Sequence, residues 1–147
     1  MKLVRFILSF FLLSFLFFAF TTEAVFFFVG YIIKDNPTGG SCSQIGLWDS
    51  NTKTCTLSGD VSASIIIDSD GLTLDGAGHM IDLDGSPFVT GIDTESHVSI
   101  TVKNIIVRKA NNTGIVVSSS ASTTLDRVGV SDSGIGVNVD NSPNTTI

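Results

Sequence analysis

The sequence predicts an all-β protein, namely a parallel β-helix of about 3–4 coils in which one short unit repeats along an axis. The first observation is a repeat with a period of 22 to 23 residues, because Gly91-Ile92 recurs as Gly114-Ile115 and Gly136-Val137. The second is that each unit contains short Val-, Ile- and Thr-rich segments bounded by Gly, Ser, Asn and Asp. The third is that residues 64–147 contain no apolar i, i+3, i+4 pattern of helical length.

Each coil is expected to contain three short strands that pair in parallel with the next coil at a spacing of about 4.8 Å. In the first, less regular coil these strands are residues 65–67, 72–74 and 79–81, separated by corners that contain Asp-Gly. Because side chains alternate along a strand, equivalent apolar residues should stack inside the coil. The predicted inward columns are Ile92 with Ile115 and Val137, Val102 with Leu125 and Ile147, Ile105 with Val128, and Val107 with Val130.

The outward positions predict a regular polar face. Asp93 and Asn138 occupy one outward column with Val116 between them, and Glu95 and Asp140 occupy the column beside it with Ser118 between them. A polar face that repeats at the strand spacing suits an extended ligand such as a polysaccharide. We therefore expect these four residues to form a glycan-binding face.

Opposite charges on neighbouring coils provide a check on this register. Lys103 would lie over Asp126, and Lys109 would lie over Asp132. Such exposed pairs contribute only about 0–1 kcal/mol each, so they support the alignment rather than the stability of the fold.

The N-terminus has the features of a secretory signal peptide over residues 1–24. Lys2 and Arg5 precede an apolar run, and small residues near Ala24 suit a signal peptidase. Ten of the eleven phenylalanines lie in the first 28 positions, which indicates membrane targeting rather than a core. An uncleaved anchor extending to residue 33 is the alternative, and residues 25–41 are expected to be a linker. The expected location is therefore secreted, periplasmic or at the cell surface.

The charge balance is acidic. Without Lys2, Arg5 and Glu23, the chain keeps six basic and thirteen acidic side chains, a net charge near −7. This charge argues against a nucleic-acid partner and against an anionic lipid surface. Binding of a cation or a neutral glycan remains compatible with it, and membrane contact is expected only through an uncleaved N-terminal segment.

Two cysteines, Cys42 and Cys55, are expected to form a disulfide, as in other secreted chains. The sequence between them contains Trp48 and reads as a hairpin with an Asp-Ser-Asn-Thr turn. Because an exposed strand edge promotes aggregation, we expect residues 42–60 to cap the N-terminal end of the β-helix. A metal-binding thiol pair is the alternative, although no histidine lies nearby in the sequence.

The β-helix is expected to occupy residues 61–147 and to be truncated at its C-terminal end, because Ile147 falls in the middle of a coil. Natural solenoids end in capping repeats. The sequence therefore suggests a fragment of a longer β-helix or, if the open end is real, end-to-end self-association.

The run from Ile67 to Ile81 resembles the opening coil of NosD-like right-handed β-helix proteins, within the broad pectin-lyase-like class. The Gly-Ile … Ile-Thr-Val-Lys-Asn-Ile … Gly-Ile pattern that follows is similar too, so the resemblance covers about residues 42–147. It implies the right-handed twist, which the general crossover rule also favours. The class includes lyases, hydrolases, adhesins and proteins linked to periplasmic copper handling, so the resemblance implies no single activity.

The side chains that could carry chemistry each have a structural interpretation. The acidic cluster of Asp68, Asp70, Asp75, Asp82 and Asp84 could hold Ca²⁺ or supply a glycosidase carboxylate pair, but Asp-Gly is also ordinary corner chemistry. The resemblance implies that His79 could be a copper ligand, but it reads more simply as a strand residue that faces solvent. It likewise implies that Arg108, Lys109 or Arg127 could be the base of a polysaccharide lyase, but these read more simply as solvated strand-end charges in cross-coil pairs. We therefore assign no catalytic, cofactor-binding or metal-binding residue.

Two sequons mark Asn111 and Asn144 as candidate N-glycosylation sites. The leading functional hypothesis is a secreted or cell-surface β-helix module with a binding or structural role towards polysaccharide. The alternatives are a fragment of a polysaccharide lyase or glycosidase whose site lies in missing coils, and NosD-like periplasmic copper handling.

Overall fold

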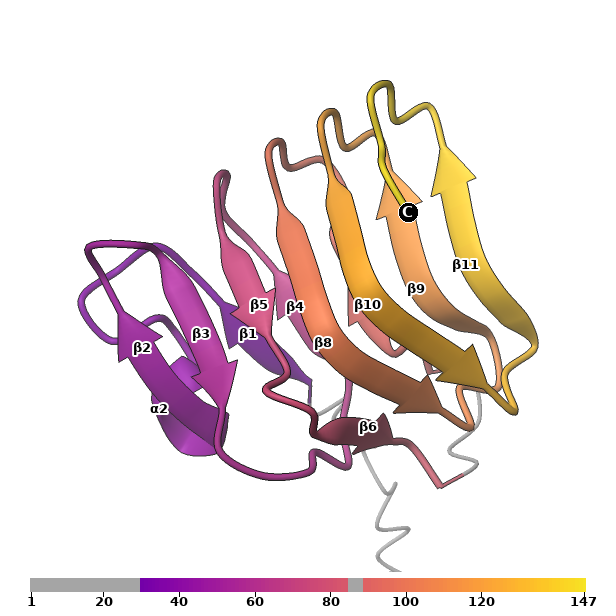
Figure 1. Cartoon of the computed structure of the whole chain (residues 1–147), viewed down its shortest axis with the longest axis horizontal. Coiled ribbons are helices and arrows are strands. Elements are labelled where there is room, and N and C mark those ends of the chain that lie inside the picture. Colours follow the sequence, from indigo (N-terminus) through magenta and orange to yellow (C-terminus); the bar gives the residue numbers. More distant parts are fainter. Residues whose placement is uncertain (1–29, 85–88) are drawn as a thin grey trace, which may run out of the picture.

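The computed structural model describes residues 30–84 and 89–147, which form a parallel β-solenoid of about four turns (Figure 1). Sheet A contains five strands in the order β1-β4-β7-β9-β11, and sheet B contains six, ordered β10-β8-β5-β3-β2 with β6 alongside β8. The strands of sheet A are β1 (Tyr31–Ile33), β4 (Ile65–Ile67), β7 (Ile92–Asp93), β9 (Thr113–Ser118) and β11 (Ile135–Asp140). The strands of sheet B are β2 (Gly46–Asp49), β3 (Thr54–Leu57), β5 (Thr73–Asp75), β6 (Met80–Asp82), β8 (Thr101–Arg108) and β10 (Thr124–Ser131). The predicted all-β solenoid is thus confirmed.

The strand register confirms the predicted inward columns except at Ile147, which is 77% exposed rather than buried. Ile115 of β9 pairs with Ile92 on one side and with Val137 on the other. In sheet B, Leu125 pairs with Val102, and a bridge between Thr124 and Thr146 continues that register to the last coil. The other two columns are also in register, as Ile105 with Val128 and Val107 with Val130. These side chains form a single core, in which Ile92, Val102 and Ile115 are fully buried.

The prediction of three strands per coil is wrong for the regular coils. β8 and β10 are each one eight-residue strand that bends in the middle, whereas the first coil keeps β5 and β6 separate. The bend lies at Asn104 in β8 and at Arg127 in β10, which have φ values of 52° and 53°. One left-handed residue turns the corner, and the register is the same on both sides of it, so the strand continues through the bend.

The corner between sheets A and B repeats the same backbone shape from coil to coil. Four residues occupy equivalent positions at this corner: Gly71, Ser99, Ser122 and Asn144. The N–H of each of the first three donates to the carbonyl of the residue that precedes the next one in this series. All four have a positive φ, between 58° and 70°. Small or short polar residues tolerate this conformation best, which explains the Gly, Ser and Asn found at this corner.

The coils differ in length by one residue, and the structure locates the difference. The N–H groups of Gly134 and Ile135 donate to the carbonyls of Ala110 and Asn112, so the ladder passes over Asn111. Asn111 is therefore the extra residue of the longer coil and forms a bulge at the corner before sheet A. A Cβ on Gly134 would lie 2.7 Å from the carbonyl oxygens of both Asn111 and Asn112, so glycine is needed beneath the bulge.

The N-terminal end is closed by the predicted hairpin. β2 and β3 pair antiparallel, and β3 in turn pairs in parallel with β5 of the first coil. The Cys42–Cys55 disulfide is present and joins β3 to the short helix α2 (Cys42–Ile45). Both cysteines are fully buried, and Cys55 continues the inward column of Leu74. The hairpin is thus stacked on the solenoid in register rather than attached beside it.

The segment expected to be a linker contains a strand. Within residues 25–41, Tyr31–Ile33 forms β1, which pairs in parallel with β4 and extends sheet A by one strand. Ile33 is 1% exposed and belongs to the core. The repeat could not reveal β1 because its coil is completed by the hairpin rather than by another copy of the unit.

The predictions about residues 1–29, namely the signal peptide and the uncleaved anchor, lie outside the described residues. In the part of the chain that is described, no helix has both the length and the apolar character needed to cross a membrane.

Candidate functional site

The predicted polar face lies on the outer surface of sheet A. Asp93 pairs with Val116, which pairs with Asn138, so these three form one outward column. Asp140 pairs with Ser118 in the neighbouring column. Glu95 continues that column by hydrogen-bond register, because the N–H groups of Thr94 and Ser96 donate to the carbonyls of Val116 and Ser118. The structure therefore brings the four predicted residues onto one face, with Val116 and Ser118 between them.

This face is polar only along the later coils. Towards the N-terminus the column of Asp93 continues as Ile66 and then Ile32, and Ile32 is 38% exposed. Asp93 is half-buried and accepts a hydrogen bond from the Glu95 N–H at 3.0 Å through Oδ1. Asn138 and Asp140 are exposed on β11. The polar surface thus runs over β7, β9 and β11, one coil spacing apart.

The face carries negative charge that no basic side chain of the described ranges neutralises through an ion pair. Each of the six basic side chains in the described ranges forms an ion pair elsewhere, namely Lys34, Lys53, Lys103, Arg108, Lys109 and Arg127. Among the described residues, Asp93, Glu95 and Asp140 have no such partner. A ligand on this face would meet carboxylate acceptors together with the amide donor of Asn138.

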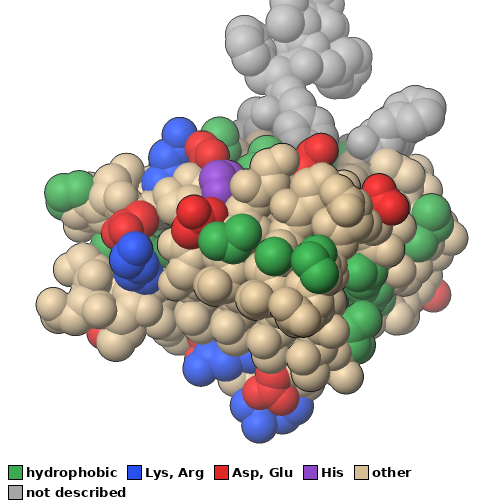
Figure 2. All heavy atoms as spheres, turned by 90° about the horizontal axis from the view of Figure 1, so that it is seen from above, with side chains coloured by type: hydrophobic (Ala, Val, Ile, Leu, Met, Phe, Trp, Pro, Cys, Tyr) green, Lys and Arg blue, Asp and Glu red, His purple; other side chains and the backbone are tan. Residues whose placement is uncertain are grey.

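A second polar group lies at the corner between sheets A and B, and sequence reasoning did not assemble it. His97 lies between two carboxylates of the preceding coil: Nε2 is 3.3 Å from Asp68 Oδ1, and Nδ1 is 3.2 Å from Asp70 Oδ1. Lys34 Nζ is 2.8 Å from the other oxygen of Asp68. Figure 2, which looks down on this corner, shows a histidine beside acidic and basic side chains.

The carboxyl groups at this corner are stabilised as anions. The hydrogen bond from the Lys34 ammonium holds the pKa of Asp68 below its ordinary value, and His97 adds to the effect. The N–H of Val98 does the same for the pKa of Asp70, with a smaller contribution from His97. A general acid for glycosidic cleavage needs a carboxyl with a raised pKa. The pKa shifts of Asp68 and Asp70 have the opposite direction. The contacts of these carboxylates with His97 instead join neighbouring coils.

The acidic cluster read from the sequence is divided among three corners. Asp75 lies at the bend beneath Asn104, whose Nδ2 donates to Asp75 Oδ1 at 3.0 Å. Partial burial alone would raise the pKa of Asp75, but the hydrogen bonds from Asn104 and from the Ala77 N–H together lower it. Asp82 lies at the next corner, where the Asp84 N–H lowers its pKa further than any other contact. In the described ranges, no three His, Cys, Asp or Glu side chains converge as a metal site would require.

The ion pairs differ from the predicted ones although the register is as expected. Asp126 pairs with Lys103 in the ladder, but Lys103 Nζ contacts Asp75 of the preceding coil at 3.2 Å. Lys109 likewise reaches back to Asp82 and Asp84, at 3.2 Å and 3.4 Å, rather than to Asp132.

The remaining basic candidates are held in structural contacts. Arg127 bonds Asn104 through Nε at 2.7 Å and Asp126 through a terminal nitrogen at 2.8 Å. Arg108 lies 3.9 Å from Asp132. The hydrogen bond from Lys109 to Asp82 raises the pKa of Lys109, which keeps its ammonium group protonated at neutral pH and so unable to accept a proton.

His79 lies apart from the corner of His97. Its Nδ1 is 3.5 Å from Asp60 Oδ1, an oxygen that also accepts the N–H of Met80 at 3.0 Å. The His79 side chain is 37% exposed. It therefore has a local structural contact and faces solvent, as its place next to a strand suggested.

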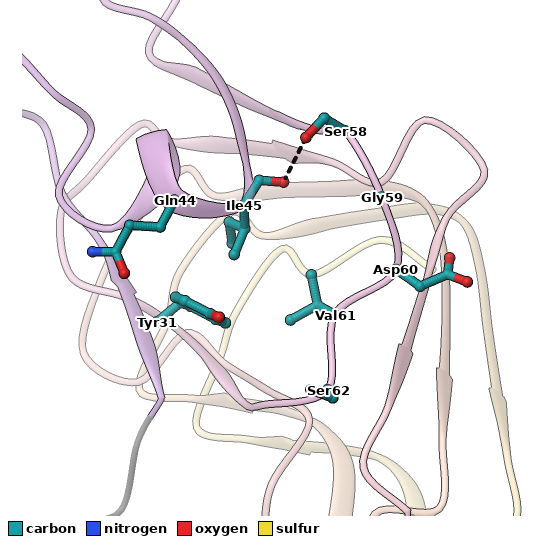
Figure 3. Close-up of a pocket in the computed structure, with 8 residues that line it drawn as sticks. All are labelled: Tyr31, Gln44, Ile45, Ser58, Gly59, Asp60, Val61 and Ser62. Carbon is teal, nitrogen blue, oxygen red and sulfur yellow. Dashed lines mark hydrogen bonds between the residues drawn. The ribbon is translucent and has the colours of Figure 1, made fainter.

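A pocket of about 220 Å³ lies at the N-terminal end of the core, beneath α2 (Figure 3). Ile45, Tyr31 and Val61 face one another across it, while the amide of Gln44 and the carboxylate of Asp60 lie towards its outer edge. Ligand pockets usually enclose about 300–1,000 Å³. This pocket is smaller, and its inner walls continue the core columns of the solenoid.

The comparisons with protein-family models, with curated proteins and with solved structures found no match for this chain. The assignment of a parallel β-solenoid therefore rests on the strand pairing described above. The NosD-like and pectin-lyase-like resemblance stays a prediction.

Proposed function

We propose that this protein is a secreted or cell-surface β-solenoid that binds an extended polysaccharide along the outer face of sheet A. The observation that carries the proposal is the pair of outward columns on β7, β9 and β11. Oxygen-bearing side chains recur in every coil in the column of Glu95, Ser118 and Asp140, whereas Val116 separates Asp93 from Asn138 in the other column. A repeated polar column suits a polymer whose hydroxyl groups also recur. The buried Cys42–Cys55 disulfide supports an oxidising, extracytoplasmic compartment.

The proposed contacts are polar rather than stacked. The described ranges contain two aromatic side chains of the Phe, Tyr and Trp group, Tyr31 and Trp48, and both belong to the N-terminal end rather than to this face. Sugar rings would therefore be held by hydrogen bonds to Asp93, Asn138 and Asp140. Each such bond contributes about 0.5–3 kcal/mol, so useful affinity requires several contacts along one polymer.

The enzymatic alternative and the copper alternative have less support. An acid–base pair needs one carboxyl group with a raised pKa. Every carboxyl group in the described ranges with a resolved shift has a lowered pKa instead, namely Asp49, Asp68, Asp70, Asp75 and Asp82. The nitrogens of His97 both face carboxylates, and His79 contacts Asp60. The polar contacts of both histidines are thus with carboxylates, whereas copper prefers soft or imidazole ligands.

The proposal is tested by co-sedimentation with insoluble polysaccharides and by titration with soluble oligosaccharides of increasing length. Replacing Asn138 and Asp140 together by alanine should weaken binding about tenfold or more, because two hydrogen-bonding groups are lost. The matched control replaces Asn112 and Asp132 by alanine. Both are exposed, and they lie outside the proposed face, just before β9 and just after β10. Equal binding by both double variants, or affinity that does not increase with oligosaccharide length, would contradict the proposed face.

A further inference from the structure

The two sequons lie at opposite ends of the strands of sheet A. Asn111 precedes β9 by two residues, whereas Asn144 follows the end of β11 by four residues. Figure 1 shows these strands running from one corner of the solenoid to the other. The two asparagines therefore lie on different corners and not on the face proposed to bind polysaccharide.

Each asparagine lies at a corner of the solenoid and is exposed. Asn111 is the bulged residue of the longer coil and is exposed. Asn144 is exposed at the left-handed corner position, with a φ of 61°. The added bulk of a glycan at either position would extend into solvent, whereas a buried position could not accommodate it.

The chemistry of the compartment is the second requirement. N-linked glycans are added to Asn-X-Ser/Thr in chains that enter a secretory pathway. The Cys42–Cys55 disulfide is a buried part of the fold, and such bonds form and persist in that oxidising environment. The disulfide and the two exposed sequons are thus both typical of a chain that enters a secretory pathway.

We propose that Asn111 and Asn144 both accept N-linked glycans when the chain passes through a secretory pathway that contains the oligosaccharide-transferring enzyme. The glycans lie at opposite ends of the strands of sheet A and leave β7, β9 and β11 open between them. This inference does not depend on polysaccharide binding, so either proposal can fail without the other.

To test the proposal, the full chain with its own N-terminus is expressed in secreting eukaryotic cells. The intact mass of the secreted protein is measured before and after treatment with peptide:N-glycosidase. The wild type should lose the mass of two glycans, and Asn111→Gln and Asn144→Gln should each lose one. The control Asn141→Gln should still lose two, because Asn141 is exposed at the same corner but has Pro143 at the third sequon position. Asn→Gln is used at both sites because Thr113, which completes the first sequon, is buried and its removal would disturb the core.

A secreted wild type whose mass is unchanged by the glycosidase would overturn the proposal, and modification of one asparagine alone would overturn it for the other. Thermal unfolding provides the second readout. Both asparagines are exposed, so removing the glycans should shift the melting temperature by only a few degrees, within the usual range of surface changes. A collapse of the fold on deglycosylation would show that the glycans are packed against the solenoid, contrary to the proposed placement.

Discussion

Gly114 and Gly136 occupy the same position in successive coils, but their surroundings differ. A Cβ added to Gly114 would lie 2.3 Å from Val130 Cγ1 and 2.7 Å from the carbonyl oxygen of Gly136. A Cβ added to Gly136 would meet no atom within 4 Å. Neither glycine has a positive φ, so alanine is compatible with the backbone at both positions.

Replacing Gly114 by alanine should therefore lower the free energy of unfolding by about 1–3 kcal/mol, the usual cost of overpacking a core. Replacing Gly136 should raise the free energy of unfolding by about 0.4–1 kcal/mol, because alanine reduces the conformational freedom of the unfolded chain. The two variants should thus differ by roughly 1.5–4 kcal/mol. For a domain slightly larger than 100 residues, at roughly 4 °C per kcal/mol, this corresponds to a difference in melting temperature of roughly 6–16 °C.

The measurement is urea unfolding of both variants, followed by circular dichroism and by the fluorescence of Trp48, the single tryptophan of the chain. A double variant adds a diagnostic step. Val130→Ala in the Gly114→Ala background removes the nearest side-chain contact but leaves the contact with the Gly136 carbonyl, so it should restore only part of the stability. If Gly114→Ala and Gly136→Ala had equal effects, the close approach of neighbouring coils inferred from the structure would be refuted.

Three further predictions concern the cap, the corner and the core. Reducing the Cys42–Cys55 disulfide should lower the free energy of unfolding by about 3 kcal/mol in the chain-entropy model, measured by urea unfolding with and without reductant; an unchanged midpoint would mean that the hairpin is held without it. The lowered pKa of Asp68 in the folded state contributes stability that is present above the ordinary pKa of the unfolded chain, about 3.9, and is lost as the pH falls through the folded value. Asp68→Asn should therefore reduce the loss of melting temperature on acidification below about pH 4, and an identical acid profile would count against the ion pair. Ile105→Ala should cost about 2–5 kcal/mol, because Ile105 is 1% exposed, whereas Ile106→Ala, at 45% exposure, should cost about 0.5 kcal/mol or less; similar losses in a thermal melt would contradict the assigned inside and outside of β8.

The candidate site was predictable as far as the repeat reached. Asp93 and Asn138 share a column because both belong to copies of one unit, and equivalent positions in a solenoid must stack. The grouping of Asp68, Asp70 and His97 was not predictable in the same way. The first coil departs from the repeat, and the contact depends on how its Asp-Ser-Asp-Gly corner lies against the next coil.

The sequence by itself determined the architecture, the register of the inward columns and the disulfide. A period of 22 to 23 residues allows one stacking, because a slip of one residue would turn every buried Ile and Val outward. Tertiary structure alone decided how each corner is made: the left-handed bends at Asn104 and Arg127, the bulge at Asn111, and the return of Lys109 to Asp82 and Asp84. The physical reason is that hydrophobic periodicity specifies which side chains are buried, whereas a corner is specified by single backbone dihedral angles and by polar contacts between coils.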